Sequence, residues 1–298
     1  MIRRAVAAAV LLAAVSGSLA PASGAQPSGF DLQAHRGGRG ETTEESLRAF
    51  AKSLELGVST LELDVVLTRD GLPLVWHDLS IESVKCADTG PVFAGDPDYP
   101  YVGKRVGELD LAQIRTLDCG LPQPEFPHAE VVAGNKIATL PEVFALARHT
   151  GVRYNVETKV DGENQQRLVE VILAAARAAG TLGDVEVQSF DWRTLALVRA
   201  IDPTVPLVAL WERGSDPIDG AVAAGADIVS PDYAVVDRKF VERAHAAGLS
   251  VIPWTVNDPA VMRELIAVGV DGIITDYPSR LRTVLAELGM PLPGGYRV

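Results

Sequence analysis

The sequence predicts an α/β protein built on a (β/α)8 TIM barrel, with a small insertion after the second strand and its hairpin. Three observations predict this class. Apolar segments of strand length alternate with amphipathic helical segments, eight such pairs follow one another, and polar residues recur where the strand segments end. An open doubly wound sheet is the alternative, because connectivity alone does not prove that the sheet closes.

Strand and helix boundaries can be read from apolar runs, prolines and glycines. The eight strand segments are 30–34, 60–67, 153–158, 185–189, 206–210, 228–231, 250–255 and 272–275. The helical segments are 44–56, 141–149, 164–179, 192–201, 217–224, 237–246, 259–268 and 278–288. Pro259 and Pro278 stand near the first position of their helices, where proline is favoured. Glycines fall where helices end, as a left-handed closing residue requires: Gly57, Gly151, Gly180, Gly225, Gly248 and Gly269.

Composition sets broad limits on the class of protein. A chain of 298 residues, 47% of them hydrophobic, is long enough for one large α/β domain or two small ones, and it is not disordered. The formal net charge of -12 argues against a nucleic-acid partner, because phosphate backbones are bound by clustered Lys and Arg. An acidic surface suits a protein that binds a divalent cation. Nothing in the sequence predicts a protein partner.

The first 25 residues have the pattern of an export signal. Arg3 and Arg4 precede an apolar run, and small residues continue up to Ala25, after which we expect cleavage. A membrane anchor is the alternative, but the run is too short to span a bilayer and Pro21 interrupts the segment after it. We therefore expect a secreted protein, without stable membrane insertion, whose mature domain covers 26–298.

Export also decides how the two cysteines, Cys86 and Cys119, are interpreted. Thiols outside the cytoplasm tend to form disulfides, so we expect these two to pair. Closing a loop of about 33 residues would restrict the unfolded chain by roughly 3 to 4 kcal/mol on the loop-entropy estimate. Two isolated sulfurs argue against a metal role.

The alternation of strands and helices breaks after the second strand. Asp70-Gly71 indicates a hairpin turn that returns the chain toward His77. Residues 79–138 are then rich in Pro, Gly and Asp, contain both cysteines, and show one short helical stretch near 111–117. We interpret 79–138 as an insertion subdomain that walls the site and shapes substrate access, with the disulfide compensating for a small core. The alternative is a surface loop without a role at the site.

Two carboxylates alternate with apolar residues in the second strand. Residues two apart face the same side of a strand, so Glu62 and Asp64 project together while their neighbours pack on the opposite side. In an arbitrary sequence such a pair most often lies on an exposed strand face. Here His35 and His77 end the neighbouring apolar runs, which favours a buried site that holds a cation between two proton carriers. Further candidates stand at the ends of later strands, the edge where barrels carry function: Glu157, Lys159, Gln188, Trp254, Asn257 and Asp276.

These motifs resemble, in their joint order and spacing, those of the glycerophosphodiester phosphodiesterase family, and the resemblance covers nearly the whole mature chain. The matching segments are Ala34-His35-Arg36-Gly37-Gly38, Glu62-Leu63-Asp64-Val65, Thr68-Arg69-Asp70-Gly71, His77-Asp78, Asn155-Val156-Glu157-Thr158-Lys159, Val187-Gln188-Ser189-Phe190, Trp254-Thr255-Val256-Asn257 and Asp271-Gly272-Ile273-Ile274-Thr275-Asp276-Tyr277-Pro278. The insertion is also similar to the small inserted subdomain of the family's secreted and periplasmic members.

The resemblance implies metal-dependent hydrolysis of glycerophosphodiesters to glycerol 3-phosphate and an alcohol. Glu62, Asp64 and Glu157 would hold one divalent cation, Ca2+ or Mg2+, because an all-oxygen ligand set suits a hard cation. Arg36 and Lys159 would add positive charge at the phosphate.

The resemblance also assigns the proton chemistry to His35 and His77, because imidazole titrates near neutral pH. In the mechanism proposed for the family, the neighbouring glycerol hydroxyl attacks phosphorus to give a cyclic phosphate, which water then opens. Which histidine acts first is open, and either could instead be a metal ligand or a core histidine.

Trp254 and Gln188 complete the expected substrate site. Trp254 would line the pocket beside the glycerol or head group, with packing inside the barrel as the alternative. Gln188, like Asn257 and Asp276, would lie at the rim, and the individual roles of the three are open. The remaining histidines, His128, His149 and His245, are expected at the surface.

One segment departs from the family pattern. Many members have Pro-Glu-Asn-Thr before the first helix, where this chain has Thr43-Glu44-Glu45-Ser46. We expect Thr43 to cap the helix, with Glu45 complementing the helix dipole in the first turn. The alternative is that Glu45 adds a carboxylate near the metal and alters its affinity or choice. The role of Glu44 is open.

Three other functions compete with this interpretation. A related barrel of phospholipase D type would act on lysophospholipid or sphingomyelin, and an apolar groove along the insertion would distinguish it. A glycoside hydrolase also uses paired carboxylates, but it leaves His35, His77, Arg36 and Lys159 without a role. A binding protein without activity would lack part of the proposed set, yet none of these residues is missing.

Overall fold

The computed structural model describes residues 29–297 of the chain. The predicted signal peptide, 1–25, lies outside these residues.

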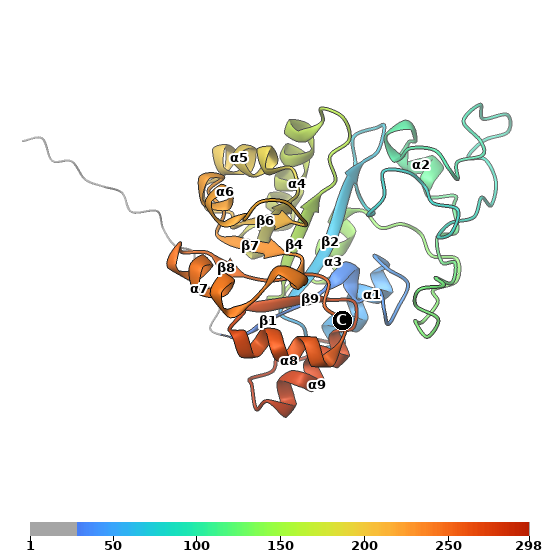
Figure 1. The fold of residues 1–298 in the computed structure, drawn as a ribbon. Helices are drawn as coiled ribbons and strands as arrows, with labels where there is room; N and C mark the ends of the chain where they lie inside the picture. The colour runs from blue at the N-terminus through green and yellow to red at the C-terminus, as the bar shows by residue number, and fades with distance from the viewer. Residues whose placement is uncertain (1–28, 298) are drawn as a thin grey trace, which may run out of the picture.

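Eight parallel strands form the central sheet (Figure 1). They are β1 (Asp31–Ala34), β2 (Thr60–Leu67), β4 (Arg153–Thr158), β5 (Val185–Ser189), β6 (Leu207–Trp211), β7 (Ile228–Pro231), β8 (Ser250–Val251) and β9 (Gly272–Thr275). Their order is β8-β7-β6-β5-β4-β2-β1-β9. The backbone amides of Asp271 and Ile274 donate to the carbonyls of Val251 and Pro253, at 2.9 and 3.0 Å, and so join the two ends of this order. The strands therefore form a nearly closed barrel, which confirms the predicted fold class.

Helices return the chain from one strand to the next and cover the outside of the barrel (Figure 1). They are α1 (Leu47–Leu56), α3 (Leu140–Leu146), α4 (Gln165–Ala179), α5 (Trp192–Ile201), α6 (Ile218–Ala223), α7 (Arg238–Ala246), α8 (Pro259–Val268) and α9 (Pro278–Glu287). Short 3-10 turns add η1 (His35–Gly37), η2 (Val106–Glu108), η3 (Leu182–Asp184) and η4 (Tyr233–Val235). None of the helices in the described part of the chain has both the length and the apolarity that a membrane span needs.

The two faces of each barrel strand differ in chemistry. In β2, Leu61, Leu63 and Val65 are fully buried in the main apolar core, between the sheet and the helices. Glu62 and Asp64 alternate with them and so face the barrel interior, as the sequence predicted. This alternation places charged groups inside a scaffold that apolar packing holds rigid.

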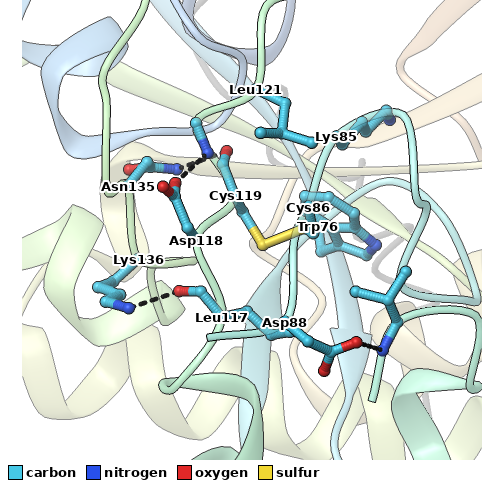
Figure 2. Close-up of a disulfide and its surroundings, with 12 residues drawn as sticks. Trp76, Lys85, Cys86, Asp88, Leu117, Asp118, Cys119, Leu121, Asn135 and Lys136 are labelled. Carbon is cyan, nitrogen blue, oxygen red and sulfur yellow. Dashed lines mark hydrogen bonds between the residues drawn. A yellow bond between two sulfur atoms is a disulfide. The ribbon is translucent and has the colours of Figure 1, made fainter. Parts of the chain in front are cut away.

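A hairpin follows β2, in which β3 (Pro73–Val75) pairs antiparallel with it. The insertion, residues 79–138, then extends to one side of the barrel and contains η2 and the single α-turn α2 (Leu111–Ile114). An apolar cluster separate from the main core joins the insertion to the hairpin; its fully buried members include Leu74, Ile81, Tyr101 and Ile114. Cys86 and Cys119 belong to this cluster and form a disulfide within it, which confirms their predicted pairing (Figure 2).

Candidate active site

Three carboxylates from neighbouring strands meet inside the barrel. Glu62 and Asp64 come from β2 and Glu157 from β4, and the parallel register sets Asp64 directly opposite Glu157. All three side chains are buried, and one oxygen of each lies within 4.8 Å of one oxygen of the others. These three residues could therefore hold a metal ion, as expected from the sequence.

Burial and mutual repulsion govern ionisation in this cluster. Burial raises the pKa of Glu62 well above its usual range, and Asp64 adds to that shift. Burial also raises the pKa of Glu157 to about 7, against the opposing effect of Lys159. For Asp64 burial again opposes ionisation, but Lys159 and Arg36 outweigh it and hold the pKa well below its usual range. A divalent cation fits this donor set, because it would offset the repulsion that burial makes costly.

Two cationic side chains already contact the carboxylates. Lys159 Nζ lies 2.6 Å from Glu157 Oε1 and 3.1 Å from Asp64 Oδ1. Arg36 Nε lies 3.2 Å from Asp64 Oδ2, and the Arg36 backbone N–H donates to Glu62 Oε2 at 2.8 Å. Arg36 adopts a positive φ of 49° in the turn η1, and this turn directs both its amide and its guanidinium toward β2.

His35 follows β1 and contacts Asp276, the residue directly after β9. Its Nδ1 lies 2.6 Å from Asp276 Oδ1, so Nε2 is the ring nitrogen left for a substrate. Asn257 donates to Asp276 Oδ2 at 2.7 Å, and Arg39 Nε donates to Oδ1 at 3.0 Å. Although burial opposes it, the pKa of Asp276 is lowered to about 2 by His35 and Arg39. Burial lowers the pKa of His35 itself below its usual value.

His77 is held in the same way from the other side of the site. Its Nδ1 lies 2.9 Å from Asp78 Oδ1, which again leaves Nε2 unpaired by this contact. Lys85 Nζ lies 2.5 Å from the second oxygen of Asp78. Burial lowers the pKa of His77 below its usual value, although Asp78 opposes the shift. Both histidines are therefore backed by a carboxylate that itself contacts a cation.

A cavity of about 220 Å³ unites these groups. Its polar lining is His35, Arg36, Arg39, Glu62, His77, Glu157, Lys159, Gln188 and Thr255. Phe190, Leu210, Trp254 and Ile274 form an apolar wall. The Phe190 and Trp254 rings meet edge to face with centroids 5.4 Å apart, and Trp254 Nε1 donates to the Ser230 carbonyl at 2.9 Å. Trp254 thus both lines the cavity and packs in the barrel.

The side chains that the sequence indicated for the active site lie at the carboxyl ends of the barrel strands, and some of them stand behind the cavity lining. Gln188 reaches the carboxylates, since its Nε2 donates to Glu62 Oε1 at 2.6 Å. Asn257 and Asp276 stand behind His35, away from the cavity lining. His128, His149 and His245 are exposed, as predicted.

Sequence reasoning assigned no role to Arg39, Lys85 and Phe190. Arg39 follows the His35-Arg36-Gly37-Gly38 motif directly, and Phe190 lies two residues after Gln188, so proximity to a motif could have indicated both. No local pattern marks Lys85.

The expectation for Thr43 and Glu45 is wrong. Helix α1 begins at Leu47 and its cap is Ser46, whose Oγ accepts from the Ala49 amide at 3.0 Å. Thr43 Oγ1 instead accepts from the Val132 amide of the insertion. Glu45 has a φ of 54°, is buried, and accepts the Asp64 backbone N–H at 3.0 Å. The turn before the helix thus directs Glu45 inward, where burial and Asp64 raise its pKa well above its usual range.

The cavity combines a carboxylate cluster, two cationic side chains and two histidines that are each paired to a carboxylate. Such a set can bind a metal ion and a phosphate and can transfer protons, which is the chemistry of a phosphoric diester hydrolase. Comparison with known proteins agrees. Residues 35–280 match the model of the Glycerophosphoryl diester phosphodiesterase family, and the chain belongs to this family.

Individual relatives support this assignment. A glycerophosphodiester phosphodiesterase of Caldanaerobacter subterraneus is 31% identical over 86% of this chain and 98% of its own length. The crystal structure of a glycerophosphoryl diester phosphodiesterase candidate from Silicibacter pomeroyi aligns with a TM-score of 0.80 at 31% identity, over 89% of this chain and 95% of that one. An Oleispira antarctica phosphodiesterase, solved with its product sn-glycerol-3-phosphate, shares the fold, with a TM-score of 0.72 at 20% identity over 87% and 97% of the two chains.

Proposed function

We propose that this protein hydrolyses glycerophosphodiesters to glycerol 3-phosphate and an alcohol, with one bound divalent cation and with His35 and His77 as its acid and base. One observation carries the proposal. Both histidines line the same cavity as Glu62 and Glu157 of the carboxylate cluster, and each has its Nδ1 paired to a carboxylate. The product of the Oleispira antarctica relative supports glycerol 3-phosphate as the product here.

The charges of the site suit a monoanionic phosphodiester. With a cation bound, Glu62, Asp64 and Glu157 would all be ionised, and together with Arg36 and Lys159 these five side chains would carry one net negative charge. A divalent cation together with a phosphodiester brings that sum to zero. Charge balance among these five side chains therefore favours binding of the cation and the phosphodiester together, because uncompensated charge is costly in a buried cavity.

Glu62, Asp64 and Glu157 would hold the cation, and their oxygen ligands favour Ca2+ or Mg2+ over softer metals. When bound, the cation polarises a phosphate oxygen and offsets the charge that develops on it. Arg36 and Lys159 line the same cavity and would contact the other phosphate oxygens.

The two histidines would move protons through Nε2. Asp276 and Asp78 favour the tautomer with the proton on Nδ1, which leaves Nε2 of a neutral ring as an acceptor. One histidine takes the proton of the neighbouring glycerol hydroxyl as that oxygen bonds to phosphorus. The other, which must enter the step with a proton on both ring nitrogens, gives its Nε2 proton to the departing alcohol oxygen as the bond of that oxygen to phosphorus breaks. Water then opens the cyclic phosphate with the two roles reversed.

We also propose that the mature protein, 26–298, is secreted and that 79–138 acts as an insertion subdomain beside the site. The disulfide between Cys86 and Cys119 supports an oxidising compartment. Lys85 of the insertion contacts Asp78, which supports a role for the insertion at the site.

The test is phosphorus NMR of glycerophosphocholine incubated with purified protein and Ca2+ or Mg2+. Matched samples contain EDTA, the His77→Ala variant, or the control variant His128→Ala, which changes an exposed histidine. We expect glycerol 3-phosphate with metal in the wild type and in His128→Ala, and none with EDTA or His77→Ala. Absence of product with either metal would overturn the proposal, and lysophosphatidylcholine and sphingomyelin would then be tested in the same assay.

A further inference from the structure

Lys85 belongs to the insertion and contacts two carboxylates beside the active site. Its Nζ lies 2.5 Å from Asp78 Oδ2 and 2.5 Å from Glu44 Oε1. The Trp76 ring lies 5.1 Å from the same ammonium group. Lys85 therefore contacts two carboxylates and one aromatic face, and only 13% of its side chain is exposed. This is far more burial and pairing than a lysine in a surface loop would have.

The backbone is fixed directly after Lys85. Cys86, the next residue, is joined to Cys119 by the disulfide, and Figure 2 shows Lys85 close to this bridge. Ala87 and Asp118 exchange two backbone hydrogen bonds, of 2.8 and 3.0 Å. The disulfide and this short ladder restrict where the lysine side chain can begin.

Glu44 connects the two halves of the site. Oε1 contacts Lys85, while Oε2 lies 3.3 Å from Arg36 Nη1 and 3.5 Å from Arg39 Nη1. Arg39 in turn contacts Asp276, the partner of His35. Although burial opposes it, Arg36 and Lys85 hold the pKa of Glu44 below its usual range, so this connection is ionic. A continuous polar chain results: His77, Asp78, Lys85, Glu44, Arg39, Asp276 and His35.

We propose that Lys85 and Glu44 are positioning residues, which set the orientation of His77 relative to His35 through Asp78, Arg39 and Asp276. The inference rests on the proposed function, in which these two histidines exchange protons with the substrate. Its consequence is that the insertion supplies part of the active site and does more than wall it.

The chemistry of the contact explains how Lys85 would act. Asp78 has one oxygen toward His77 and the other toward Lys85. The ammonium group therefore fixes the rotation of the carboxylate about its own axis and keeps one oxygen aimed at Nδ1. Without the lysine, Asp78 can turn toward solvent, since a quarter of its side chain is exposed, and His77 then loses the contact that selects its tautomer.

The first test compares Lys85→Met with Lys85→Arg, assayed on glycerophosphocholine with saturating metal. We expect Lys85→Met to lower kcat by about tenfold or more while KM changes little, as for loss of a group that orients a catalytic side chain. Lys85→Arg retains a cation and should recover most of the lost kcat. Lys104→Met is the matched control, because Lys104 belongs to the same insertion and makes no contact with Asp78 or Glu44.

The second test measures the tautomer of the His77 imidazole directly. Nitrogen-15 NMR of protein labelled at its histidines distinguishes a ring protonated on Nδ1 from one protonated on Nε2, and a His77→Gln spectrum assigns the signal. It is recorded without metal or substrate, so it does not depend on activity. We expect the Nδ1–H form of His77 in the wild type and in Lys85→Arg, and a mixture of tautomers in Lys85→Met.

The two proposals fail in different ways. If His77→Ala keeps full activity, the proposed function is wrong. If His77→Ala is inactive while Lys85→Met has wild-type kcat and an unchanged His77 spectrum, the positioning role is wrong and the proposed function stands. Should Lys85→Met not fold, Glu44→Gln tests the same chain from its centre, with reduced kcat supporting the role and unchanged kcat opposing it.

Discussion

Gln188 donates a hydrogen bond of 2.6 Å from Nε2 to Oε1 of Glu62, inside the barrel. The orientation of the Gln188 amide is itself fixed, because its Oε1 accepts from Asn155 Nδ2 at 3.0 Å. Asn155 gives its other proton to Gln33 Oε1 at 2.8 Å. With the Arg36 amide on the second oxygen, Glu62 is held from both sides. A row of neutral amides thus aims one carboxylate of the cluster without adding charge to it.

Replacing Gln188 with alanine should therefore weaken the binding of metal. Glu62 loses a donor that orients it, and loss of such a supporting contact typically costs about 10–100-fold in metal affinity. Isothermal titration of the purified protein with Ca2+ or Mg2+ measures the change. The exposed Gln166→Ala variant serves as the control. Equal affinities for Gln188→Ala and the wild type would mean that Glu62 needs no help from Gln188.

The barrel could be predicted from sequence because its elements are defined locally. The predicted segments 185–189 and 228–231 coincide with β5 and β7, where short apolar runs end at turn residues. The segment 250–255 was predicted as one strand, but β8 keeps only two residues. Pro253 lacks the N–H that a longer ladder requires.

The residues that line the cavity and those that support them differ in how far the sequence could predict them. Glu62 and Asp64 stand in a regular strand, and His35 and His77 follow a strand within two residues, so periodicity and order place the four together. Lys85, Arg39 and Glu45 reach the site through irregular turns and through the packing of the insertion. Such contacts depend on backbone angles like the φ of 54° at Glu45, for which no repeating pattern exists.

The disulfide should contribute to stability and activity together. The double variant Cys86→Ser with Cys119→Ser frees a loop of 33 residues and should lower the free energy of unfolding by about 3 to 4 kcal/mol. Its kcat should also fall, because Lys85 precedes Cys86 and loses its anchor. Urea unfolding and a steady-state assay of the same preparation measure both effects, with reduced wild-type protein as a second comparison. A variant that is less stable but fully active would show that the disulfide is not needed to position Lys85.

Glu186 lies at the end of the barrel opposite the active site, and its ionisation should make the stability of the protein depend on pH. Burial raises the pKa of Glu186 from its ordinary value of 4.5 to about 7, with Arg153 opposing the shift. A carboxyl with a raised pKa stabilises the fold below its unfolded pKa, and this contribution is lost as the pH rises through about 7. The free energy of unfolding should therefore fall over this window, by up to about 1.4 kcal/mol per pH unit from this group.

The Glu186→Gln variant should flatten this dependence, because glutamine does not titrate and its carbonyl still accepts from Gln33 Nε2. Urea unfolding at several pH values between 4.5 and 7 gives the two slopes. Glu163→Gln, at an exposed position, provides the baseline. Identical slopes for Glu186→Gln and the wild type would show that Glu186 titrates normally in the folded protein.

Phe190 should govern substrate affinity and leave the chemical step unchanged. It is 47% exposed, yet it lines the cavity and packs its ring against Trp254, so a bound substrate would cover apolar surface that now faces water. Phe190→Ala should raise KM by about tenfold, which is equivalent to about 1.4 kcal/mol of binding free energy, while kcat stays nearly constant. The reason is that a contact made equally in the ground state and the transition state affects substrate binding alone.

Trp254→Phe is the matched comparison from the same wall. It keeps an aromatic face but loses the hydrogen bond from Nε1 to the Ser230 carbonyl, so its stability should fall by about 1 kcal/mol. Steady-state kinetics on glycerophosphocholine and thermal unfolding of both variants separate the two roles. If Phe190→Ala lowers kcat and leaves KM unchanged, the ring positions reacting groups, and the apolar wall belongs to the catalytic machinery as well as to substrate recognition.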